Sequence, residues 1–185
     1  MIAELAHELS RVTHTCVREP ATSQQITELR AAYPEIPDCL IQLLTFANGE
    51  VDPIFRHNGM IAFEAFYGCE EIVSYSDFAT SYSAYGDLNQ FVQTKRIDKS
   101  TNWHEGLIPI SFGYDAHIVC IDMEPGADGL AGQILALRPI TGNISVISNS
   151  LEELLTKTLE LYRAKNIDFA DDDCPLLTLE DFPEM

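Results

Sequence analysis

The chain has 185 residues, 46% of them hydrophobic and 22% charged, which favours one domain with enough apolar material for its own core. Its 29 acidic residues against 11 basic ones give a formal net charge of −18. A surface this negative disfavours nucleic acids and anionic membranes as partners, because both carry phosphates, and it favours encounter with a basic protein.

The cysteines and the apolar runs indicate the compartment. The five cysteines lie at long, irregular spacings, which argues against a disulfide scaffold. The first residues lack the apolar core of a signal peptide, and no stretch approaches the roughly 20 apolar residues of a transmembrane helix. We therefore expect a reduced, cytoplasmic protein.

The N-terminal segment predicts an added helix in front of the main domain. Four apolar residues recur at helical spacing before Pro20, namely Ile2, Leu5, Leu9 and Val12. We assign residues 1–19 to this extra helix.

Two short helices are predicted next. Thr22 and Gln25 have the spacing of a capping box, and Pro34 ends the helix that they begin. The following segment, IPDCLIQLLTFANG, starts a second helix near Pro37 and stops it at Asn48 and Gly49.

The middle of the chain gives weaker signals. Residues 60–66, MIAFEAF, are short and almost wholly apolar, which favours a buried strand. Residues 76–93 show no clean period, and we predict a loop with one possible helical piece around residues 78–85.

Four short apolar segments then predict an antiparallel meander, because turn residues separate them: LIPISF after Gly106, AHIVCID, QILALR and NISVIS. Ser150 can cap a closing helix whose apolar residues face the sheet. The predicted fold class is α+β, with N-terminal helices, a curved and mainly antiparallel sheet of about five or six strands, and a C-terminal helix packed on the sheet.

After Asn166 the composition becomes acidic, with seven acids, no base, and Leu176, Leu177, Leu179 and Phe182 among them. Such a segment is either a flexible tail or a strap whose apolar residues dock on the body. The predicted organisation is thus the extra helix 1–19, a main domain 20–165 and an acidic C-terminal tail 166–185.

Motifs for catalysis and for metal binding are weak. His117 and Cys120 are three residues apart on a strand and point to opposite faces, so they do not form a metal pair. Asp122, Glu124 and Asp128 imitate a calcium loop, but Pro125 and Gly126 break its ligand pattern, which favours a solvated acidic loop. Phosphate-loop and nucleophile-elbow motifs are absent. We expect no enzyme activity, no metal and no cofactor.

The order of these segments resembles the SUKH superfamily, which includes fungal cell-wall-assembly regulators and bacterial immunity proteins. Three blocks carry the resemblance. The first is IPDCLIQLLTFANG, and the second is Trp103 followed by LIPI and VCIDMEPG. The third is a strand that begins with Gly132, Ile134 and Leu135, together with the closing helix SLEELL. They span about residues 20–165. One departure is Glu50, which stands where the family has a second glycine after Asn-Gly.

The resemblance implies a binding protein, specifically an immunity protein that neutralises a cognate toxin through protein–protein contact. A regulatory interaction module of the cell-wall-regulator kind is the alternative, and an unrecognised hydrolase is a third class.

No basic residue lies between Lys99 and Arg138, and acids cluster in this interval. We predict that they form a negative patch at one sheet edge that binds a basic toxin domain. The expected contact residues are Glu105, Tyr114, Asp115, Asp122, Glu124 and Asp128.

Overall fold

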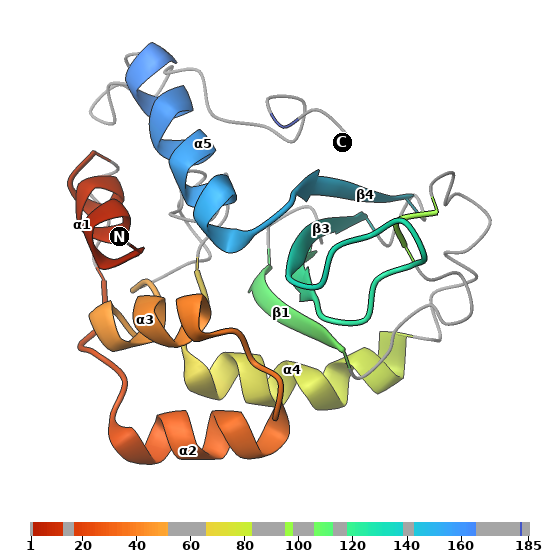
Figure 1. The fold of residues 1–185 in the computed structure, drawn as a ribbon. Coiled ribbons are helices and arrows are strands. Elements are labelled where there is room, and N and C mark those ends of the chain that lie inside the picture. The colour runs from red at the N-terminus through yellow and green to blue at the C-terminus, as the bar shows by residue number, and fades with distance from the viewer. Residues whose placement is uncertain are drawn as a thin grey trace.

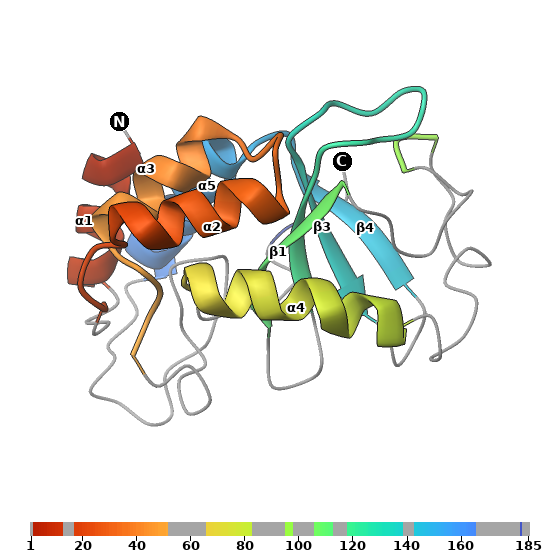
Figure 2. The same ribbon diagram turned by 90° about the horizontal axis from the view of Figure 1, so that it is seen from below.

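Helices dominate the first half of the chain, and a four-stranded sheet followed by a last helix forms the second half (Figure 1). A computed structural model describes residues 2–12, 17–51, 66–82, 95–97, 106–112, 118–138, 143–165 and 182. Figure 2 shows the first three helices and the last helix gathered to one side of the sheet, with the fourth running beneath it.

The first three helices follow the sequence signals closely. They are α1 (Ile2–Val12), α2 (Ser23–Ala32) and α3 (Asp38–Phe46). The predicted capping box at the start of α2 is confirmed: the Gln25 N–H donates to the Thr22 hydroxyl oxygen at 3.3 Å, and the Gln25 side chain accepts from the Thr22 N–H at 2.9 Å. Pro37 is the N-cap of α3, where its missing N–H costs nothing.

Helix α4 (Cys69–Tyr82) begins well before the helical piece that we expected around residues 78–85. Its cap explains the difference, because the Cys69 N–H donates to the Asn48 side-chain oxygen at 2.8 Å, from a residue 21 positions earlier in the chain. The Gly68 N–H donates to the Glu71 carboxylate at 3.1 Å. A start signal supplied from so far away is invisible to local sequence patterns.

Residues Asn48–Glu50 and Gly68–Glu71 form one close contact, which we call the glycine junction. Gly49 has φ +90°, and a Cβ there would lie 2.6 Å from the Gly68 nitrogen. Arg18 pairs with the Glu71 carboxylate. Glu50 is buried, and its carboxylate accepts the Phe66 N–H. The junction therefore joins the end of α3, the start of α4 and the link before α2.

The sheet is the predicted meander, with strands β1 (Leu107–Phe112), β2 (Ile118–Asp122), β3 (Gln133–Arg138) and β4 (Asn143–Ser148) in that spatial order. All three pairings are antiparallel. The α+β class is confirmed, but the described part of the sheet has four strands rather than about five or six.

The outer edge of β1 is irregular. A register shift lies between Pro109 and Ser111, and Phe66 forms an isolated bridge to Ser111. The Tyr67 N–H donates to the Ile110 carbonyl at 3.0 Å. Phe66 is the last residue of the predicted strand 60–66, whose other residues lie outside the described part of the chain.

The two faces of the sheet bury separate sets of apolar residues, because strand side chains alternate between faces. One face joins the main core with the helices, through residues such as Val119, Ile121 and Ile134. The opposite face forms a second cluster with Ile118, Cys120, Leu135, Leu137, Val146 and others.

Helix α5 (Leu151–Lys165) packs on β3 and β4 and is covered by α1. Its predicted cap is confirmed, since the Glu153 N–H donates to the Ser150 hydroxyl oxygen at 3.2 Å. Phe182, from the acidic tail, is buried and belongs to the main core. At this residue the tail docks on the body, which was one of the two alternatives.

None of the helices within the described ranges combines the length and apolarity needed to cross a lipid bilayer.

Candidate functional site

The loop that connects β2 to β3, Met123–Gly132, projects beyond the end of the sheet (Figure 2). We call it the connecting loop. It contains the VCIDMEPG segment's last residues and two of the acids predicted to bind a partner. Its conformation is set by hydrogen bonds rather than by regular secondary structure.

Asp122 fixes both ends of the loop. Its side chain is fully buried, and its carboxylate accepts the Glu124 N–H at 3.0 Å and the Gln133 side-chain amide at 2.9 Å. Gln133 faces Asp122 across the β2–β3 pairing. Gly132, at φ +90°, turns the chain so that its N–H reaches the Asp122 carbonyl at 2.7 Å. The loop therefore closes on its own first and last residues.

A second anchor holds the middle of the loop. The Gly126 N–H and the Gln133 side-chain amide both donate to the Arg96 carbonyl at 2.9 Å, and the Asp128 N–H donates to the Lys95 carbonyl at 3.2 Å. The Arg96 guanidinium donates in turn to the Asn149 side-chain oxygen at 2.8 Å, just before α5. The loop is thus tied to the start of the last helix.

The exposed side chains of the connecting loop are partly apolar and partly acidic. Leu130 is 54% exposed. Glu124 and Asp128, six and two residues before it in sequence, are exposed too. The small residues Ala127 and Ala131 are exposed as well.

The structure divides the six predicted contact residues into three groups. Glu124 and Asp128 lie exposed on the connecting loop. Asp122 is buried, so the expectation of a solvated acid is wrong for this residue: two hydrogen-bond donors hold it inside, and it positions the loop rather than touching a partner. Glu105, Tyr114 and Asp115 lie outside the described residues.

Leu130 is the residue that sequence reasoning missed. An available signal was its place between Gly129 and Gly132 in a segment without strand or helix periodicity, where a large apolar residue has no core position to occupy. Its side chain carries no charge, so the clustering of acids does not point to it.

The described thiols are unsuited to nucleophilic chemistry. Cys39, Cys69 and Cys120 are free, and burial is the main cause that raises the pKa of each; for Cys120, which is fully buried in the sheet, the pKa lies well above its usual range. Cys120 packs as a small hydrophobe, as expected. Across the described ranges, no group of three or more His, Cys, Asp or Glu side chains is placed to hold a metal ion.

An antiparallel meander flanked by helices, with a hydrogen-bonded exposed loop, defines a small α+β domain. The chain belongs to the SMI1 / KNR4 family (SUKH-1), whose sequence model matches residues 20–157. Membership indicates a non-catalytic domain of the immunity or cell-wall-regulator kind that acts through protein–protein contact. A search of curated proteins gave no match.

Proposed function

We propose that this chain is an immunity protein, and that it neutralises a cognate toxin by binding a basic surface of the toxin with its connecting loop. The observation that carries the proposal is the loop itself, in which Leu130, 54% exposed, shares a hydrogen-bonded frame with the exposed acids Glu124 and Asp128. The domain 20–165 is the binding unit in this proposal.

Rigidity favours tight binding because association costs less entropy when a loop is already ordered. The frame around Asp122 and Arg96 fixes the backbone before a partner arrives. Leu130 can then act as an apolar anchor, which lowers the dissociation rate, while Glu124, Asp128 and the net charge of −18 speed encounter with a basic partner.

The proposed location is the cytoplasm, where a toxin would have to be neutralised in its producer or in neighbouring cells of the same kind. The free thiols of Cys39, Cys69 and Cys120 support a reducing compartment.

The test starts with capture of the partner from the native organism by the immobilised chain and its identification by mass spectrometry. Binding kinetics of the purified partner are then measured for the parent and two variants. The double variant Glu124→Lys/Asp128→Lys should associate about tenfold more slowly and with a flatter salt dependence. Leu130→Asp should lose about 2 kcal/mol of binding free energy, mainly through faster dissociation.

Val51 supplies the matched control, because it is 47% exposed and lies in the glycine junction region rather than on the loop. Val51→Asp should bind like the parent. The immunity role requires that the captured partner be toxic when expressed alone, and that co-expression of the parent, but not of Leu130→Asp, restores growth. A partner that is harmless on its own would favour the regulatory alternative, and unchanged binding by all loop variants would reject the loop as the contact surface.

A further inference from the structure

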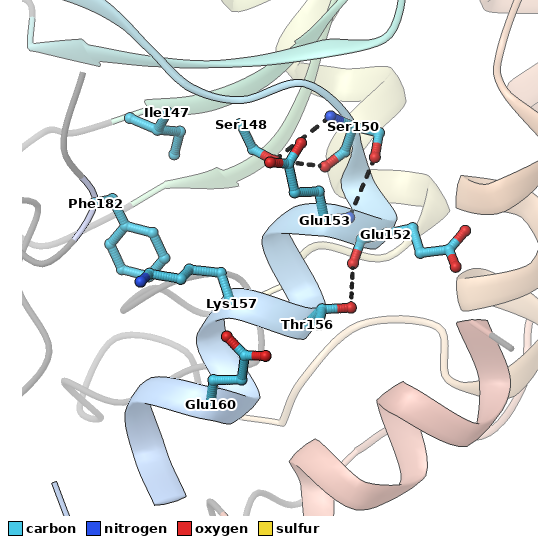
Figure 3. A pocket seen from close by; sticks show the side chains of 9 residues that line it. All are labelled: Ile147, Ser148, Ser150, Glu152, Glu153, Thr156, Lys157, Glu160 and Phe182. Atoms are coloured by element: carbon cyan, nitrogen blue, oxygen red, sulfur yellow. Dashed lines mark hydrogen bonds between the residues drawn. The ribbon is translucent and has the colours of Figure 1, made fainter. Parts of the chain in front are cut away.

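A hollow of about 610 Å³ lies against the outer face of α5 (Figure 3). One wall is the exposed stripe of the helix, Glu153, Lys157 and Glu160, which lie one and two turns apart. Ile147, near the end of β4, and Phe182, from the tail, line the other side, and both are almost wholly buried. Helix α5 and the tail residue Phe182 thus line the hollow together.

The charge in the hollow is negative. Among the lining residues that the structure describes, Glu152, Glu153 and Glu160 stand against one cation, Lys157. Glu153 is engaged, because its carboxylate accepts the Asn149 N–H at 3.0 Å. Glu160 makes no ion pair or hydrogen bond within the part of the chain that the structure describes, so its charge is available to a ligand.

The hollow lies at the same end of the sheet as the connecting loop. Ser148, which lines the hollow, pairs with Ile134 near the start of β3, directly after the loop. Asn149 joins the two regions physically, because its side chain accepts from Arg96, the anchor of the loop, while its N–H donates to Glu153 in the hollow. One partner can therefore reach both regions.

From this placement we propose that the hollow is a second contact region for the partner and receives an arginine-containing segment. The inference rests on the proposed binding function. Arginine fits because its charge can meet Glu160 and Glu153, while its aliphatic stem can cover the small apolar area that the largely buried Ile147 and Phe182 leave at the hollow. The positive charge of Lys157 repels an incoming cation, so a weakly basic segment should bind less tightly than an arginine-rich one.

The test uses the full-length, ¹⁵N-labelled chain and a blocked pentapeptide of alternating glycine and arginine, titrated at low ionic strength and followed by amide chemical shifts. We expect shifts along residues 150–160 and at Phe182. Glu160→Lys should weaken peptide binding about fivefold, and Lys157→Glu should strengthen it by a similar factor, because each change moves the local charge by two units in opposite directions. The control Glu19→Lys, at an exposed position on the link between α1 and α2, should stay within about twofold of the parent.

Four results would overturn the inference. If Glu19→Lys weakens binding as much as Glu160→Lys, the peptide responds only to net charge. If the shifts are confined to the connecting loop, the hollow takes no part, although the loop proposal stands. If arginine amide binds as tightly as the peptide, the hollow recognises a small cation rather than a segment of protein. If the glutamine counterpart of the peptide binds equally well, charge is not what is recognised. Because this titration needs no captured partner, its outcome is independent of whether that partner is a toxin.

Discussion

The connecting loop and the glycine junction are both irregular segments built around a buried acid, yet they are held in opposite ways. In the loop, Asp122 binds groups two and eleven residues away, the Lys95 and Arg96 carbonyls hold the middle, and the side chains of Glu124, Asp128 and Leu130 are exposed. In the junction, Glu50, Asn48 and Glu71 bind residues 16, 21 and 53 positions away. The first arrangement displays a surface, and the second fastens distant parts of the chain.

The difference explains where change should be tolerated. A contact that spans many residues closes a long segment of chain, and its loss loosens several elements at once. A locally closed loop can exchange its outward residues without touching the core, which suits a surface that has to match one partner.

The largest effect is expected from a pair of glycines with the same backbone angle. Gly49 and Gly132 both have φ +90°, but a Cβ at Gly49 would lie 2.6 Å from backbone, whereas a Cβ at Gly132 would meet nothing within 4 Å. Gly49→Ala should therefore cost about 3 kcal/mol or more of unfolding free energy, and Gly132→Ala only about 1 kcal/mol from backbone strain. Urea unfolding measures both. Equal costs would show that the close approach at the junction adds nothing to the strain.

A medium effect is expected from Asp122→Asn in the loop. The substitution replaces one of the two acceptor oxygens by an NH₂ group, which is a donor. This group then faces another donor, either the Gln133 side-chain amide or the Glu124 N–H. Because the site is fully buried, the loss should be about 2 kcal/mol of unfolding free energy.

Glu124→Gln is the matched control for that change, since it makes the same replacement at an exposed loop position. It should alter the unfolding free energy by less than about 0.5 kcal/mol. A similar cost for both variants would mean that burial of Asp122 does not hold the loop.

The smallest effect concerns alkaline pH at the junction. Burial, with Glu71 and Glu70 nearby, raises the pKa of Cys69 from 9.0 to about 11 in the folded protein. Between these two values the thiol ionises in the unfolded chain but not in the folded one, so stability falls as pH rises through that window. Cys69→Ala should lose this part of the pH dependence in unfolding curves recorded across the window. An unchanged slope would contradict the assignment.

Local signals predicted most of the fold. The Thr22–Gln25 capping box, the helix stop at Asn48–Gly49 and the turns between the four strands each act within a few residues, so the sequence reveals them directly. The start of α4 was missed because its cap comes from Asn48.

The site was predictable only in part, for a related reason. Acidic residues can be counted along the chain, and their clustering predicted Glu124 and Asp128 as contact residues. Burial of Asp122 depends on Gln133 across the sheet, and the hollow on α5 depends on Phe182, which returns to the helix from 17 residues beyond its end. Such features follow from packing between distant segments and leave no local pattern.

The irregular edge of β1 has a consequence for the behaviour of the protein in a crowded cell. Pro109 offers no N–H to a neighbouring strand, the register shift beside it bends the edge, and Phe66 and Tyr67 already occupy the bonding groups around Ile110 and Ser111. A second copy therefore finds no straight row of free donors and acceptors on which to stack. This side of the sheet is protected against edge-to-edge aggregation, and the mutual repulsion of molecules that each carry a charge of −18 adds to that protection.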